Sequence, residues 1–227
     1  MRILIIGHGR MGKLIESLAP EHACEVAGIA EIQTPLAEVL GEAGPVDVAI
    51  DFSHAESVRQ NLTALAARKI SVVVGTTGWQ DVEPELRAIA KDAGIGVLAS
   101  ANFSIGMNVF RILVEQAAAR YSALADVGAW IQEAHHAAKK DAPSGTALLL
   151  LAAMREAGYT AAIDVSSTRA GHIPGTHVVG FDGTAETVTL THTVRDRAVF
   201  AHGALEAAKW LKGRRGWFSM RDMIGGV

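Results

Sequence analysis

Residues 3–12 read Ile3-Leu-Ile-Ile-Gly-His-Gly-Arg-Met-Gly12 and join a strand pattern directly to a helix start. The first four form the continuous apolar run that is typical of a strand buried on both faces of a parallel sheet. The last six match Gly-x-Gly-x-x-Gly, and apolar residues then recur at helical spacing through Leu14, Ile15 and Leu18. Glycines in such a turn let the backbone approach a pyrophosphate at the helix N-terminus. The stretch therefore predicts a dinucleotide site.

An acidic residue follows the next strand pattern. Residues 24–30 form that pattern, and Glu31 comes directly after it, 19 residues beyond Gly12. In dinucleotide-binding folds an acid at about this distance binds the ribose hydroxyls of the adenosine and disfavours a 2′-phosphate. Residues 32–34, Ile-Gln-Thr, include no Arg or Lys. We therefore expect NADH as the preferred cofactor and NADPH as the second one.

The alternation of strand and helix continues to Phe103. Apolar strand patterns at 46–51, 70–74 and 95–98 are separated by helical patterns. Such alternation predicts an α/β fold with a doubly wound parallel sheet, a Rossmann fold, over residues 1–103. Ligands collect outside the carboxyl ends of these strands. The loops at those ends are Gly7–Gly12, Glu31, Asp51–His54, Gly75–Trp79 and Ser100–Phe103.

The pattern changes after Phe103. One long helix is predicted over 105–121, followed by strands rich in Thr and Val at 164–168, 176–180 and 186–193. Asp-Gly-Thr-Ala at 182–185 is a hairpin signal. These features predict a second, smaller α+β domain with a mixed sheet over residues 104–196. The tail is predicted to be helical over 200–211 and 220–224, with a turn rich in Gly and Arg between the two helices.

Residues 133–147, Glu-Ala-His-His-Ala-Ala-Lys-Lys-Asp-Ala-Pro-Ser-Gly-Thr-Ala, combine two imidazoles, two ammonium groups and a helix start. Ser144 is a good N-cap, and the backbone N–H groups beyond it favour an anion. Lys139 and Lys140 add positive charge, and His135 and Lys139 are side chains that exchange protons. The stretch therefore predicts a pocket that binds a carboxylate and handles protons. The alternative is an exposed basic loop that only caps a helix.

The pattern His135-His136-x-x-Lys139-x-Asp141-x-Pro143-Ser144-Gly145-Thr146-Ala147 resembles the signature of the 4-hydroxy-tetrahydrodipicolinate reductase (dihydrodipicolinate reductase) family. The resemblance covers nearly the whole chain, although the first glycine turn is one residue tighter and residues 151–162 replace a longer helix and loop. It implies NAD(P)H-dependent reduction of 4-hydroxy-tetrahydrodipicolinate to tetrahydrodipicolinate in the diaminopimelate and lysine pathway. It also implies that residues 197–227 return to the nucleotide domain and that substrate domains pack into a homotetramer.

The resemblance also implies roles for single residues. His135 is the proton donor and acceptor, and Lys139 is the second proton donor. The residues implied to hold the substrate carboxylates are His136, Lys140, Gly145 and Thr146. The residues implied to contact the cofactor are Gly7, His8, Gly9, Arg10, Met11, Gly12, Glu31, Gly75, Thr76, Thr77, Ser100, Ala101, Asn102 and Phe103. Arg169 also matches the family pattern, and it is an anchor either for the sheet or for a substrate carboxylate.

Two other functions fit the same pattern. One is a related NAD-dependent dehydrogenase acting on an amino dicarboxylate. The other is a nicotinamide-sensing regulator that keeps the fold and has lost turnover, although the presence of both His135 and Lys139 counts against it. The regulator would bind nicotinamide without turnover. The related dehydrogenase would turn over, but with a different substrate from the reductase.

Composition narrows the function further. The 227 residues are 49% hydrophobic and 20% charged with a formal net charge of −3, so no basic excess indicates nucleic acid or a membrane surface. The single Cys24 excludes an internal disulfide and fits a reducing cytosol, and no apolar run is long enough for a membrane span. The histidines lack metal-ligand spacing. We expect a cytoplasmic enzyme without a metal, a membrane anchor or a nucleic-acid partner.

Overall fold

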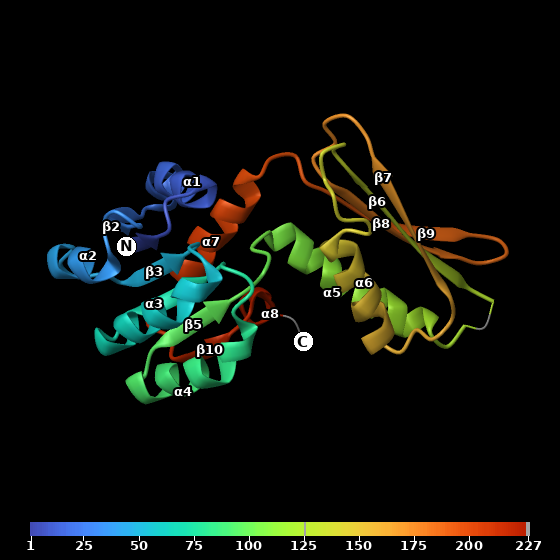
Figure 1. The fold of residues 1–227 in the computed structure, drawn as a ribbon. Coiled ribbons are helices and arrows are strands. Elements are labelled where there is room, and N and C mark those ends of the chain that lie inside the picture. The colour runs from blue at the N-terminus through green and yellow to red at the C-terminus, as the bar shows by residue number, and fades with distance from the viewer. Residues whose placement is uncertain (125, 226–227) are drawn as a thin grey trace. The chain divides into compact units, whose positions relative to one another are not determined.

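The computed structural model describes residues 1–124 and 126–225, and the chain divides into two compact units. Unit 1 comprises Met1–Ile105 together with the chain from Ala198 onward, and unit 2 is Gly106–Arg197. The chain therefore leaves unit 1 once and returns to it (Figure 1). Each unit has its own sheet and its own buried apolar core.

Unit 1 contains a sheet of six parallel strands in the order β10-β5-β4-β3-β1-β2. The central strands are apolar except at single end residues, Arg2, Asp51 and Ser71; Ile3, Leu4 and Ile5, for example, are 0% exposed. A strand can be apolar on both faces only where helices cover both. The Rossmann-like fold predicted from the sequence is thus confirmed. The strands are β1 (Arg2–Ile6), β2 (Glu25–Ala30), β3 (Val48–Asp51), β4 (Ser71–Val74), β5 (Gly96–Ala99) and β10 (Gly216–Phe218).

Three helices cover each face of this sheet (Figure 1). The first group packs on the side chains of Leu4 and Ile6, and consists of α2 (Leu36–Glu42), α3 (Ala55–Ala67) and α4 (Glu83–Ala93). The second group packs on Ile3 and Ile5, and consists of α1 (Arg10–Leu18), α7 (Ala198–Leu211) and α8 (Met220–Ile224). Short 3-10 turns lie at Ala19–His22 and Gln80–Val82.

Two elements of unit 1 differ from the sequence prediction. The stretch expected to be only a turn before residue 220 contains β10, whose three residues pair with Gly96, Val97 and Leu98 of β5. Three residues are too few to show a periodic pattern, so the pairing with β5 decides this strand. Helix α2 also lies between β2 and β3, where no helix was predicted; it has seven residues and begins after Pro35.

Unit 2 contains a mixed sheet of four strands in the order β7-β6-β8-β9, as predicted. Strands β6 (Gly128–His135) and β7 (Ile163–Arg169) are parallel, whereas β8 (Thr176–Asp182) and β9 (Thr187–Thr193) continue the sheet antiparallel. Helices α5 (Ile105–Tyr121) and α6 (Gly145–Glu156) pack on one face (Figure 1). The structure places α5 at the predicted residues. Side chains such as Phe110, Ile131, Leu150 and Phe181 form the core between them.

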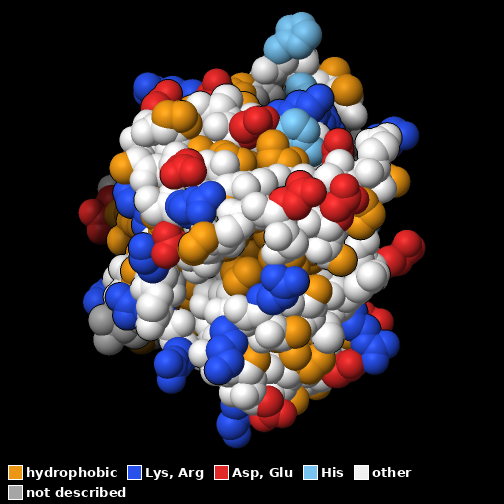
Figure 2. All heavy atoms as spheres, turned by 90° about the vertical axis from the view of Figure 1, so that its left-hand side faces the viewer, with side chains coloured by type: hydrophobic (Ala, Val, Ile, Leu, Met, Phe, Trp, Pro, Cys, Tyr) orange, Lys and Arg blue, Asp and Glu red, His pale blue; other side chains and the backbone are white. Residues whose placement is uncertain are grey.

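The surface carries charges of both signs. On the face shown in Figure 2, basic and acidic side chains are interspersed among hydrophobic ones. None of the described helices combines the length and the apolar character needed to cross a membrane.

Candidate active site

A pocket of about 540 Å³ lies at the carboxyl ends of β1, β2 and β3. Of the predicted cofactor residues it is lined by Gly7, His8, Gly9 and Glu31, whereas Arg10, Met11 and Gly12 lie in α1 and do not line it. Gly12 has a different function: a Cβ there would lie 2.1 Å from the carbonyl oxygen of Gly7. Any larger residue would therefore push the helix away from the strand, and the glycine turn could not close.

A second pocket, of about 330 Å³, continues the first. It shares the residues Phe52, Ser53 and His54 with the first pocket and adds the predicted loop Gly75, Thr76 and Thr77. The two pockets therefore form a run along the carboxyl edge of the sheet. An extended ligand such as a dinucleotide fits such a run, because its adenosine and its second base are held at different strand ends.

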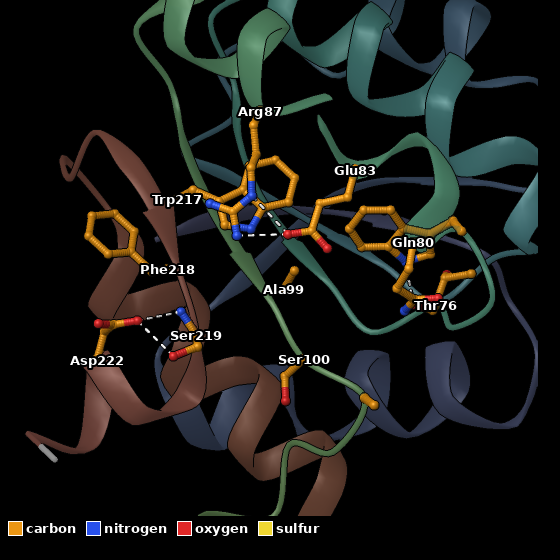
Figure 3. Close-up of a pocket in the computed structure, with 12 residues that line it drawn as sticks. Thr76, Gln80, Glu83, Arg87, Ala99, Ser100, Trp217, Phe218, Ser219 and Asp222 are labelled. Atoms are coloured by element: carbon orange, nitrogen blue, oxygen red, sulfur yellow. Dashed lines mark hydrogen bonds and ion pairs between the residues drawn. The ribbon is translucent and has the colours of Figure 1, made fainter. Parts of the chain in front are cut away.

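The loop after β5 lines a third pocket, of about 310 Å³, shown in Figure 3. Thr76 belongs to both the second and the third pocket, and Ser100 and Ala101 line the third. Its other side is formed by residues from α4, β10 and α8, including Arg87 and Trp217 (Figure 3). The structure therefore brings most of the predicted cofactor residues to one edge of the sheet.

Asn102 and Phe103 lie outside these three pockets. The Asn102 backbone is held by the Ser100 hydroxyl, which accepts from its N–H at 3.2 Å and donates to its carbonyl at 2.9 Å. Phe103 is 2% exposed and packs edge-on against Phe52, with ring centroids 5.8 Å apart. In this structure the two residues shape the loop and the core beneath it.

Asp51 ties the ends of β3 and β4 together, which the sequence did not predict. Its carboxylate is 1% exposed. Oδ1 accepts from the backbone N–H of Ser53 at 2.9 Å, from its hydroxyl at 2.6 Å and from Thr76 Oγ1 at 3.1 Å. Oδ2 accepts from Asn61 Nδ2 at 3.0 Å. The loops that line the second pocket are thus fixed by one buried acid with neutral donors.

In unit 2 a second buried carboxylate belongs to Glu133, which is 0% exposed. On the face of the sheet covered by the helices, it stands in a row of cross-strand partners, Ser167, Glu133, His177 and His192. Burial by itself would raise the pKa of this carboxyl, but hydrogen bonds, foremost those from Arg169, lower the pKa to about 2. Glu133 is therefore ionised at neutral pH.

Four groups bind the Glu133 carboxylate: Ser167 on the neighbouring strand β7, and the three groups whose contacts follow. Arg169, at the end of β7, donates from Nη1 to Oε2 at 2.8 Å and from Nη2 to Oε1 at 2.7 Å. His135 Nδ1 lies 2.5 Å from Oε2, and the Ser144 backbone N–H donates to Oε1 at 3.1 Å. Arg169 Nη2 also donates to the Asp141 carbonyl at 2.5 Å. These contacts make Arg169 an anchor for the sheet and for the loop that follows β6.

Ser144 caps α6 as predicted. Its hydroxyl oxygen accepts from the Ala147 N–H at 3.1 Å and lies 3.1 Å from Nε2 of His177. His177 is 4% exposed. Burial, together with the nearby His135, lowers the pKa of His177 to about 4, so its imidazole is neutral at physiological pH.

The loop between β6 and α6 carries the remaining predicted residues. Lys139 Nζ lies 2.7 Å from Asp141 Oδ1, and this hydrogen bond lowers the pKa of Asp141. Lys139 is half-buried, whereas Asp141 is exposed. The predicted carboxylate-binding residues lie on the same loop and on the first turn of α6; they are His136, Lys140, Gly145 and Thr146. Within residues 1–124 and 126–225, no cluster of acidic, His and Cys side chains has the geometry of a metal site.

Three functional candidates received no role in the sequence analysis: Glu133, His177 and Asp51. A signal existed for Glu133, because residues two apart on a strand face the same side and His135 was already a candidate. His177 and Asp51 owe their place to strand pairing between distant segments, which the chain order does not show.

Comparison with known proteins matches one family over both units of the chain. The models of the two halves of one family match, described as dihydrodipicolinate reductase, N-terminus, over residues 1–103, and C-terminus, over residues 106–224. The 4-hydroxy-tetrahydrodipicolinate reductase of Stenotrophomonas maltophilia is 41% identical over 239 residues, covering 99% of this chain and 98% of the relative. The enzyme of the same name from Christiangramia forsetii is 33% identical over 235 residues, with the same coverage.

A solved structure shows the same fold. The dipicolinate-bound dihydrodipicolinate reductase of Paenisporosarcina sp. TG-14 superimposes with a TM-score of 0.84 at 20% identity, covering 99% of both chains. Both halves of this chain, the glycine turn in unit 1 and the His135 loop in unit 2, lie within the matched regions. The chain belongs to the dihydrodipicolinate reductase family.

Proposed function

We propose that the chain reduces 4-hydroxy-tetrahydrodipicolinate to tetrahydrodipicolinate with a reduced nicotinamide cofactor, in the diaminopimelate and lysine pathway. Relatives of that name are matched over nearly their full length. The observation that carries the proposal is His135, which ends β6, is held by the buried carboxylate of Glu133 and directly precedes the loop that carries Lys139 and the family's pattern. A sheet that binds a dinucleotide and a loop that handles protons are what such a reduction needs.

Unit 1 offers the site for the cofactor. The residues along the run of pockets fit a dinucleotide, since Gly7 and Gly9 leave the backbone open at one end and Thr77 offers an exposed hydroxyl at the other. Glu31 lines the first pocket, where it would accept from the ribose hydroxyls. Bound there, reduced nicotinamide supplies a hydride. No Lys or Arg is among the described residues that line the first pocket, which supports NADH as the preferred form.

Unit 2 offers the groups that manage protons and carboxylates. His135 donates and accepts a proton at its imidazole, and Lys139 donates a second proton when water is lost from the ring. His136 and Lys140 hold the substrate carboxylates, together with the N–H groups of Gly145 and Thr146 at the start of α6. A helix N-terminus favours an anion, and the α6 N-terminus is held in place by Ser144.

An absorbance assay at the nicotinamide band, with substrate generated enzymatically, tests the proposal. We expect NADH oxidation that requires the substrate and stops when generation of the substrate is blocked. NADH binding without turnover would instead identify a sensing regulator. Turnover only with an amino dicarboxylate would identify the related dehydrogenase.

We also propose that the chain assembles as a homotetramer through the second face of the unit 2 sheet. Trp130 and Val178 point to this face. On the adjacent strand β9, Thr189 pairs with Gly180 and Thr191 pairs with Val178, so these two threonines point to the same face. Helices α5 and α6 cover the other face, so apolar side chains here need cover from another copy. Light scattering at micromolar concentration should give four times the chain mass of 23.9 kDa, and a monomer would refute the proposal.

A further inference from the structure

The contact between Glu133 and His135 determines which ring nitrogen carries the proton. The ionised carboxylate can only accept hydrogen bonds, and Oε2 lies 2.5 Å from Nδ1 of His135. Nδ1 must therefore carry a hydrogen, which leaves Nε2 as the nitrogen that exchanges a proton. Nε2 lies beside Gly175, where an added Cβ would be 3.2 Å away. Gly175 has φ of +133°, a conformation that residues with a Cβ rarely adopt, so residue 175 puts no side chain of its own against Nε2.

The ring is held from two further sides. Arg169 binds both oxygens of Glu133 in a bidentate pair, so the carboxylate cannot rotate away from His135. The ring of His177 packs edge-on against that of His135, with centroids 5.1 Å apart and planes inclined by 71°. The orientation of the imidazole is therefore fixed before any substrate binds.

We propose that Glu133 is the positioning residue of the active site: it selects the Nδ1–H tautomer of His135, aims Nε2 at the substrate and stabilises the imidazolium. This inference rests on the proton role proposed above for His135. The carboxylate itself gains no proton, because Nδ1–H stays bound to it while Nε2 gives and regains its proton.

The charged and titratable groups around His135 come from three strands and one loop. Glu133 lies on the same strand, Arg169 ends β7 and His177 is on β8, while Lys139, on the loop after β6, acts electrostatically on His177. Arg169 opposes a positive charge on His135, but its own charge is matched by the bidentate contact with Glu133. His177 is neutral because burial lowers its pKa to about 4. The ionised carboxylate of Glu133 is thus the charged group that contacts the His135 ring directly.

The test begins with the wild-type protein. Nitrogen NMR of the histidine rings should show His135 with its proton on Nδ1 at pH values where the ring is neutral. A proton on Nε2 instead would overturn the proposal without any variant. Glu133→Gln keeps the shape and removes the charge; we expect a mixture of tautomers, a shifted pH profile of kcat and a loss on the order of 10²-fold in kcat.

A double variant separates positioning from a general loss of structure. If Glu133 acts through His135, His135→Gln combined with Glu133→Gln should have the kcat of His135→Gln alone. Ser167→Ala is the matched control, because Ser167 also hydrogen-bonds Glu133, from the neighbouring parallel strand β7. It should lower the melting temperature while the tautomer of His135 and the pH profile stay as in the wild type.

The outcomes distinguish this inference from the function on which it rests. Wild-type kcat in His135→Gln would contradict the proposed proton role of His135. Loss of kcat in His135→Gln, with an unchanged tautomer and an unchanged pH profile in Glu133→Gln, would overturn only the positioning role. A double variant much slower than His135→Gln alone would also overturn it, since Glu133 would then act by another route.

Discussion

Among the residues that the structure describes, each unit has one carboxylate buried among polar partners, Asp51 in unit 1 and Glu133 in unit 2, with exposures of 1% and 0%. Asp51 is bound by Ser53, Asn61 and Thr76, which are all neutral donors. Glu133 is bound by the guanidinium of Arg169 and by the imidazole of His135. The difference lies in the partners rather than in the burial.

Neutral donors and ionisable donors give a carboxylate different functions. The partners of Asp51 have no proton to exchange near neutral pH, so this carboxylate can only fix the loops at the ends of β3 and β4. The imidazole bound to Glu133 does exchange protons, and Arg169 keeps the carboxylate charged. Changes around Asp51 should therefore alter stability and cofactor affinity, whereas changes around Glu133 should alter turnover and its pH dependence.

The largest expected effect concerns Lys139, on the loop of unit 2. A positioned acid is typically worth ~10²–10⁴ in rate, so Lys139→Ala should lower kcat by that order. NADH affinity should stay unchanged, because the run of pockets belongs to unit 1. His135→Gln should behave similarly. Measuring kcat, NADH affinity and melting temperature on the same proteins checks both predictions.

Lys140→Ala is the matched control for Lys139→Ala, since it removes the neighbouring ammonium group. It should mainly raise KM for the substrate, because Lys140 is proposed to hold a carboxylate. If Lys139→Ala melts early and keeps a normal kcat at low temperature, the loop only caps α6 and the catalytic assignment is wrong.

The next effect concerns Asp51. Asp51→Asn replaces one acceptor by an N–H donor that faces the donors already present, and an unsatisfied buried donor costs about 1–3 kcal/mol. We expect a lower melting temperature and an NADH affinity weakened about tenfold, a difference of about 1.4 kcal/mol. The shape of the kcat–pH profile should not change. A shifted kcat–pH profile in Asp51→Asn would mean that Asp51, like Glu133, affects proton transfer and does not only fix the loops.

The third expected effect is a loss of folding stability at acidic pH. Glu133 has a pKa lowered from 4.5 to about 2, so its contribution to stability is present above pH 4.5 and is lost as the pH falls toward 2. The shift corresponds to about 3 kcal/mol, of which about 2 kcal/mol should be lost between pH 7 and pH 3. Urea unfolding of wild type and Glu133→Gln at these two pH values checks this. The difference in the free energy of unfolding between wild type and Glu133→Gln should be smaller at pH 3 than at pH 7. An equal difference at the two pH values would contradict the prediction.

The sequence predicted unit 1 well because continuous apolar strands such as 3–6 have few alternatives to a parallel sheet. It missed β10 because residues 216–218 become a strand only by pairing with β5. The His135 loop was recognisable from its residues and from the family it resembles. The role of Arg169 stayed open because Glu133 and Arg169 are 36 residues apart, and only the pairing of β6 with β7 brings them together.

The smallest expected effect concerns an exposed acid, Glu31, at the mouth of the first pocket. A carboxylate that accepts from the ribose hydroxyls repels a 2′-phosphate, so NADH should be favoured over NADPH by about tenfold in kcat/KM, or about 1.4 kcal/mol. Ile32 is 86% exposed and lines the same pocket, so Ile32→Arg would place a cation beside that phosphate. Ile32→Arg should reduce the preference for NADH over NADPH with little change in kcat. The neutral variant Ile32→Gln should keep the wild-type preference. Equal or better kcat/KM with NADPH in the wild type would show that Glu31 does not select the cofactor. A large fall in kcat for Ile32→Arg would show that unit 1 contributes more than binding.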